Sequence, residues 1–211
     1  MPFRGSYEQS SNTPDSVPFL GFQEVALTDV DDKSDDYPNM DMFLEIHFRN
    51  GNSQYPWKYS LLGSFDREND ETISGGSSLL KRILYFTDAI GWTGGVNTKG
   101  EWVDGDNKPV KDIAGLLNSK FTAANYGLDD SEADYKYYIF TYKKWNEKAG
   151  KAYTTVCPKI VENNERNRND LESYVQYMKA NKFIVEHDDT QKPVTNGDMT
   201  STTTGSSHNT F

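Results

Sequence analysis

Apolar and polar residues alternate along several short stretches of this chain, and such alternation predicts β-strands with one buried face. The clearest case is 40–49, where Met, Met, Leu, Ile and Phe occupy every second position and mostly charged residues stand between them. An Asn-Gly-Asn turn follows at 50–52, and the aromatic-rich stretch 55–62 continues the alternation. Because Asn and Gly tolerate the positive φ angles of tight turns, this pattern predicts a β-hairpin over 40–62.

A second predicted hairpin contains a dense run of aromatic residues. Tyr, Phe and Trp occupy six of the eleven positions at 135–145, and β-branched Ile and Thr occupy two more. This composition favours a strand. A lysine-rich turn at 146–151 joins it to a partner strand at 152–161. We also predict strands at 17–30 and 120–126.

Other stretches have the apolar spacing of helices. Ser77 or Ser78 is expected to cap a helix that runs to about Ile90 and carries one apolar stripe. Asp112 is expected to cap a short helical turn, and a final amphipathic helix is expected over 167–183.

The order of these elements is strand, hairpin, helix, strand, hairpin and helix. It predicts a mainly β fold, namely a five-stranded OB-fold-like Greek-key barrel with one or two packed helices. We expect this domain to span 17–185. Residues 1–16 lack apolar periodicity and predict a flexible N-terminal arm. The Ser/Thr-rich residues 186–211 predict a disordered C-terminal tail that ends in Phe211.

Composition indicates a soluble protein of a reducing compartment. The chain has 211 residues and one cysteine, Cys157, which excludes a disulfide framework. It contains no run of about 18 apolar residues that could cross a membrane, and its N-terminus lacks the apolar segment of a signal peptide. We therefore expect a cytoplasmic protein without a membrane partner.

Charge is distributed unevenly along the chain. Twenty-two basic residues against 32 acidic ones give a net charge of −10, which argues against binding of duplex DNA through uniform surface charge. Between 134 and 185, however, ten Lys and Arg stand against six Asp and Glu. The positive charge is therefore concentrated around the aromatic strand, as expected for an acidic body with one local basic groove.

The strand at 135–145 is the centre of the predicted binding site. With a period of two, Tyr138, Phe140 and Tyr142 share a face that Lys136 and Lys144 bracket. Flat rings on which bases stack, next to cations that hold phosphates, are typical of proteins that bind single-stranded nucleic acid. The alternative is that the rings belong to the core and the lysines only protect an edge strand against aggregation.

Two sets of residues are predicted to contact the nucleic acid. The aromatic side chains expected to stack on bases are Trp57, Tyr59, Tyr138, Phe140, Tyr142 and Trp145. The cations expected to hold phosphates are Arg49, Lys58, Lys136, Lys143, Lys144, Lys148 and Lys151. Several of these lysines crowd one end of the second hairpin, where the alternative is an exposed loop kept soluble by lysine.

Signatures of an enzyme are missing from the sequence. Two of the three histidines fall at 186–211, and no nucleophile elbow, dinucleotide fingerprint or phosphate-binding loop occurs. The acidic run at 29–36 lacks the Gly and the distal Glu of a helix-loop-helix calcium site and is interpreted as a solvated turn. We therefore expect a protein that is not an enzyme and has no cofactor and no metal centre. A metal-dependent nuclease is an alternative, because acids from distant strands can meet without a local signature.

Four parts of the chain resemble the phage-encoded single-stranded-DNA-binding proteins of the OB-fold type. They are the hairpin at 40–62, the Leu-rich helix at 79–90 with Gly-Trp after it, the stretch at 113–121, and the aromatic hairpin. The resemblance covers about 17–161. It implies binding and protection of single-stranded DNA, largely without sequence preference, during DNA replication or recombination in the host-cell cytoplasm.

Members of that family often end in an acidic, flexible tail whose last residue is Phe. The resemblance therefore implies that Phe211 contacts replication or recombination proteins, although the acids of this tail stop well short of its end. A different interpretation is a structural or adaptor module, such as a virion component, that uses an aromatic sheet face for protein contact. The sequence leaves open whether the protein is a monomer or a dimer.

Overall fold

The computed structural model describes residues 20–50, 57–68, 71–122 and 135–185. The predicted arm, the predicted tail and Phe211 lie outside these residues. No helix in the described ranges is long and apolar enough to cross a membrane.

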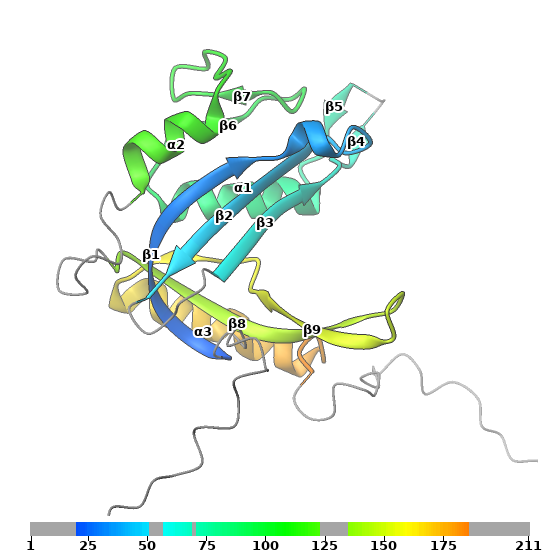
Figure 1. The fold of residues 1–211 in the computed structure, drawn as a ribbon, viewed down its shortest axis with the longest axis vertical. Coiled ribbons are helices and arrows are strands. Elements are labelled where there is room, and N and C mark those ends of the chain that lie inside the picture. The colour runs from blue at the N-terminus through cyan, green and yellow to red at the C-terminus, as the bar shows by residue number, and fades with distance from the viewer. Residues whose placement is uncertain (1–19, 51–56, 69–70, 123–134, 186–211) are drawn as a thin grey trace, which may run out of the picture.

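One antiparallel sheet dominates the fold, in the order β10-β8-β1-β2-β3, and β9 pairs with β8 (Figure 1). Its strands are β1 (Gly21–Asp32), β2 (Met42–Arg49), β3 (Trp57–Gly63), β8 (Tyr137–Asn146), β9 (Lys151–Val156) and β10 (Val161–Glu162). The predicted hairpin at 40–62 corresponds to β2 and β3, and the aromatic hairpin corresponds to β8 and β9. The alternation of apolar residues thus located the first hairpin, and the aromatic and β-branched composition located the second.

β1 is long enough to join the two halves of the sheet. Its first residues pair with β8, from Gly21 to Val25, and its later residues pair with β2, from Ala26 to Asp32. The register shifts between Leu27 and Asp29, and such an irregularity bends a strand. The sheet therefore curls, and Figure 1 shows the β8–β9 hairpin crossing below the β1–β2–β3 layer.

The two edges of the curled sheet approach each other at β3 and β9. The Tyr59 hydroxyl of β3 donates a hydrogen bond to the Pro158 carbonyl, just after β9, at 2.9 Å. Within the described residues no backbone ladder joins β3 to β9. The prediction of a mainly β fold is confirmed, and the sheet that forms it is open along this edge.

Three helices and several short elements complete the fold. The helices are α1 (Ser78–Ala89), α2 (Ile113–Phe121) and α3 (Glu165–Ala180). The short elements are η2 (Ser34–Asp36) and the two-residue strands β4 (Arg67–Glu68), β5 (Thr72–Ile73), β6 (Gly95–Val96) and β7 (Trp102–Val103). α1 packs on the β1–β2–β3 layer, and α3 lies along β8 on the opposite side (Figure 1).

The predicted helix starts are partly confirmed. The Asp112 carboxylate accepts a hydrogen bond from the Gly115 backbone N–H at 2.7 Å, so Asp112 caps α2 as expected. Ser77 precedes α1, but its hydroxyl accepts from the Asp66 N–H at 3.2 Å and does not cap the helix. This hydrogen bond connects the loop after β3 to the start of α1.

The strand predicted at 120–126 is wrong where the structure describes it. Lys120 and Phe121 are the last two residues of α2. Ile113, Leu117 and Phe121 are spaced by four residues, so they share one helix face that packs on the core. This apolar stripe outweighs the local strand propensity of the segment.

The core has two parts that lie on opposite faces of β8. Tyr137 and Ile139 point into the larger part, between the sheet and the helices α1 and α2. Phe140 and Tyr142 point the other way, into a smaller part that α3 covers. Both faces of the aromatic strand are therefore buried over this length.

Candidate nucleic-acid interface

The predicted row of exposed rings on β8 is covered in the structure. Phe140 is 7% exposed and Tyr142 is 5% exposed. They pack with the apolar stripe of α3, formed by Leu171, Val175 and Met178. An amphipathic helix must bury its apolar face, and the aromatic face of β8 is the partner it uses. The expectation that these rings are free to stack on bases is corrected accordingly.

Tyr138 is half-buried and already has neighbours on its ring. It stacks on Phe22 with ring centroids 5.5 Å apart, and the Arg168 guanidinium lies 5.0 Å from its centroid. Arg168 is in turn paired with Glu24 at 2.6 Å. Tyr138 is therefore held in an intramolecular stack.

The two aromatic residues predicted on β3 are buried as well. Trp57 and Tyr59 point into the larger part of the core. Burial raises the pKa of Tyr59 to about 12, so its hydroxyl stays protonated and donates to Pro158. These side chains fix the position of β3 and do not present free ring faces. Trp145, near the end of β8, is half-buried.

The predicted phosphate-binding cations lie in several places. Lys143, Lys148 and Lys151 belong to the β8–β9 hairpin, and Arg49 ends β2. Lys136 lines a cavity of about 330 Å³ beside the end of α2, together with Leu27, Ile90, Lys120, Phe121, Thr122 and Tyr137. Lys58 and Lys144 are brought together in a different place, the gap between the two sheet edges.

That gap is a groove of about 510 Å³, and we call it the β3–β9 groove. It is lined by Lys58, Tyr59, Ser60, Leu62, Ser78, Arg82, Tyr142, Lys144, Tyr153, Thr155, Val156 and Pro158. Three of these side chains are cations and none is an acid, although the chain carries a net charge of −10. The groove is thus a locally basic site on an acidic protein.

Arg82 of α1 is fixed against the β3 side of the groove. Its guanidinium lies 5.7 Å from the centroid of the Tyr59 ring, and its Nη1 donates to the Leu62 carbonyl at 3.3 Å. A guanidinium has five N–H donors, so donors remain for an anion after this bond. Arg82 therefore offers an ordered cation at the groove wall.

Tyr153 and Lys144 form a pair on the β9 side of the groove. They are directly opposite in the β8–β9 register, and both are exposed. Tyr153 is 44% exposed, which leaves ring surface for a flat ligand. An exposed ring beside an exposed lysine is the arrangement predicted for β8, and the structure places it at the open edge of the sheet.

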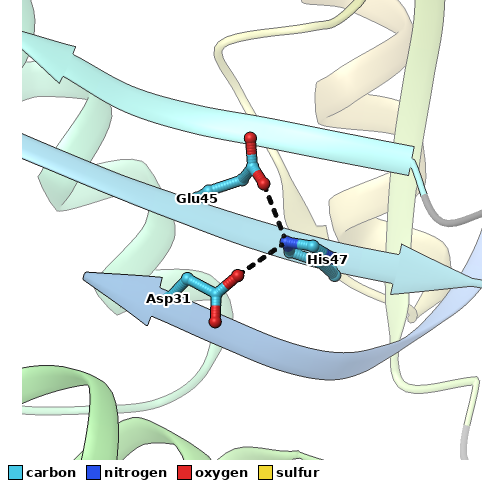
Figure 2. A group of neighbouring side chains, drawn as sticks. All are labelled: Asp31, Glu45 and His47. Atoms are coloured by element: carbon cyan, nitrogen blue, oxygen red, sulfur yellow. Dashed lines mark hydrogen bonds and ion pairs between the residues drawn. The ribbon is translucent and has the colours of Figure 1, made fainter. Parts of the chain in front are cut away.

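A cluster of charged side chains lies on the outer face of β1 and β2 (Figure 2). Register places Asp31 opposite Glu45 and brings His47 next to them. His47 Nε2 is 3.1 Å from Glu45 Oε1 and 3.4 Å from Asp31 Oδ2. The three ligand atoms that these residues offer lie within 4.8 Å of one another, a spacing that a metal ion can bridge.

Two lysines already neutralise this cluster. Lys33 Nζ is 2.7 Å and Lys58 Nζ is 2.8 Å from the same Glu45 oxygen. Burial raises the pKa of Glu45, but the hydrogen bonds from Lys33 and Lys58 outweigh burial and lower it to about 2. Glu45 therefore stays ionised and binds Lys58, a residue that also lines the β3–β9 groove.

The low pKa of Glu45 predicts a pH effect on stability. Its folded pKa lies below the ordinary value of 4.5, so its ionisation stabilises the fold above that pH, and this contribution is lost as pH falls toward 2. Glu45→Gln lacks the contribution at every pH. In thermal melts Glu45→Gln should have a lower melting temperature than wild type at pH 6, and the difference in melting temperature should be smaller at pH 3.

The control is Asp35→Asn, at an exposed acid nearby, which should melt at the wild-type temperature at both pH values. An equal difference between Glu45→Gln and wild type at pH 6 and pH 3 would contradict the assignment.

Sequence reasoning missed Arg82 and Tyr153. Arg82 stands among ordinary helix residues, and Tyr153 is an isolated ring in a Thr-rich strand, so neither carries a local signal. Their importance arises only when the curled sheet brings α1 and β9 to the same groove. The chain matches no known family model, no curated protein and no solved structure.

Proposed function

We propose that the protein binds single-stranded DNA in the β3–β9 groove and protects it during DNA replication or recombination. The observation that carries the proposal is the groove lining, which holds Lys58, Arg82 and Lys144 and includes no acid among the described residues. Cations bind phosphates, and this binding weakens as the salt concentration rises. The exposed Tyr153 ring offers a stacking surface for any base. The acidic remainder of the surface repels a polyanion and directs it to this groove.

The strand connections support the same proposal. In an OB-fold, five strands form a partly open Greek-key barrel, and oligonucleotides bind at one sheet face and at the hairpins beside it. Here β1, β2 and β3 form a meander, α1 follows, and β8 and β9 return to the other side of β1. We infer an OB-like barrel left open between β3 and β9, with the binding groove along the opening.

The three cations are available to phosphates in different degrees. Lys144 is exposed on β8. Lys58 gives one hydrogen bond to Glu45, and an ammonium has three donors, so two remain. Arg82 uses one donor on Leu62. Each therefore can bind a phosphate without breaking the contacts that position it.

Salt dependence tests the phosphate contacts. Single strands lose affinity with a log–log slope of about −0.7 per phosphate held, so three contacts give about −2. Lys144→Gln should bring the slope to about −1.4. Fluorescence anisotropy of labelled oligo-dT at several salt concentrations measures both. Lys108→Gln, at an exposed lysine outside the groove, should leave the slope unchanged. A slope near zero in wild type would favour the adaptor interpretation, because apolar protein contacts are not screened by salt.

One observation favours a second function, a metal-dependent nuclease. Asp31, Glu45 and His47 offer carboxylate and imidazole ligands at metal-binding spacing. Lys33 and Lys58 both contact the same Glu45 oxygen, so a metal ion bound at that oxygen would compete with them. Overnight incubation of single-stranded DNA with the protein and Mn²⁺ or Mg²⁺ separates the functions. Cleavage that Glu45→Gln abolishes supports the nuclease, and intact DNA supports binding alone.

A further inference from the structure

Four aromatic rings form a continuous row on the surface made by α1 and α3, and we call it the aromatic ladder. Tyr85 belongs to α1, Tyr174 and Tyr177 belong to α3, and Phe183 follows α3. Successive ring centroids are 6.2, 6.3 and 6.4 Å apart. Tyr177 is 57% exposed and Phe183 is 51% exposed, so the outer half of the ladder is open to solvent.

A lysine is built into the inner half of the ladder. Lys159 Nζ lies 5.7 Å from the centroid of Tyr85 and 5.8 Å from that of Tyr174. These distances are within the range of cation–π attraction. Lys159 also pairs with Asp170 of α3. The Lys159 side chain is only 15% exposed, so its ammonium holds Tyr85 and Tyr174 in place and forms the base of the ladder.

The ladder begins where the β3–β9 groove ends. Pro158 lines the groove, and Lys159 is the next residue. Arg82 also lines the groove, and Tyr85 lies one turn further along the same helix. Tyr142 of the groove and Tyr174 of the ladder belong to the same part of the core. Groove and ladder are therefore neighbouring parts of one surface.

We propose that the aromatic ladder continues the binding track beyond the groove, with Tyr177 and Phe183 stacking further unpaired bases of the same strand. The inference rests on the proposed function and extends the length of strand that the protein covers. Rings stack on every base, so this part of the track is sequence-tolerant. The residues next to the outer rings fit a polyanion, because Lys179 and Lys182 lie between Tyr177 and Phe183 in the sequence.

Oligonucleotide length separates the ladder from the groove. The full chain is titrated with labelled oligo-dT of about 5 and about 15 nucleotides, near the limits of site size for one OB-fold. Tyr177→Ala/Phe183→Ala should bind the long oligonucleotide at least about 30-fold more weakly, since two lost stacks together remove about 2 kcal/mol or more. The short one should bind as to wild type. Tyr37→Ala, at an exposed ring outside the ladder, should change neither.

The possible outcomes decide between the two proposals. Unchanged binding of both lengths by the ladder variant overturns the inference, and the proposed function stands if Lys144→Gln still weakens binding. Failure of wild type to bind either length overturns the proposed function itself. A change of oligomeric state in light scattering would assign the rings to a protein interface and overturn the inference. The two single variants are measured as well, so that a folding defect in the double variant is recognised.

Discussion

Phe140→Ala is expected to lower the free energy of unfolding by about 3–5 kcal/mol, the usual range for removing a buried phenyl ring. The ring is 7% exposed, and its centroid lies 4.7 Å from that of Phe22 and 6.1 Å from that of Tyr142. Its removal leaves a cavity between β8 and α3 that the paired strand cannot close. Since domains are stable by about 5–15 kcal/mol, urea denaturation should show a large shift of the midpoint.

Lys144→Ala provides the matched control on the same strand and the same face. Lys144 is exposed, so its removal should change the unfolding free energy by less than about 0.5 kcal/mol. In oligo-dT binding the order should be reversed. Lys144→Ala should weaken binding because it removes a phosphate contact, and Phe140→Ala should change the affinity less. If Phe140→Ala instead unfolds like wild type and loses DNA binding, the ring is exposed and acts in stacking.

The fold could be predicted where the signal is local. The alternation at 40–49 located β2, and Asp112 marked the start of α2, because each depends on neighbours within a few residues. The faces of β8 could not be resolved in the same way. A period of two shows that Phe140 and Tyr142 share a face, but the helix that covers this face begins at Glu165. Whether a ring is buried depends on that distant partner.

The groove was predictable only in part, for the same reason. Lys58 and Lys144 were among the predicted phosphate contacts, because they stand beside aromatic residues in the sequence. Arg82 and Tyr153 join them through the curl of the sheet, which the sequence does not display. The Glu45 cluster likewise forms across strands, so the acids that meet there were indistinguishable from other surface acids.

The location of the groove shows how β8 can support the proposed binding site although α3 covers its rings Phe140 and Tyr142. β8 places Tyr142 under α3 and, two residues later on the same face, Lys144 in the open. β9 places Tyr153 opposite Lys144. The covered rings therefore anchor the hairpin, while Tyr153 and Lys144 near its end are exposed to solvent. Rigid support of this kind is what a stacking site needs.

Tyr153→Ala is expected to weaken oligo-dT binding by about 1–3 kcal/mol, or about 5- to 150-fold, because it removes the exposed ring of the groove. Tyr153→Phe keeps the ring and loses only the hydroxyl, so it should bind nearly as wild type. Both are measured by anisotropy at one low salt concentration, with melting temperatures recorded. Equal losses for both variants would assign the effect to the hydroxyl and contradict stacking. Because Tyr153 is 44% exposed, neither change should destabilise the fold strongly, and the affinities then report the binding surface itself.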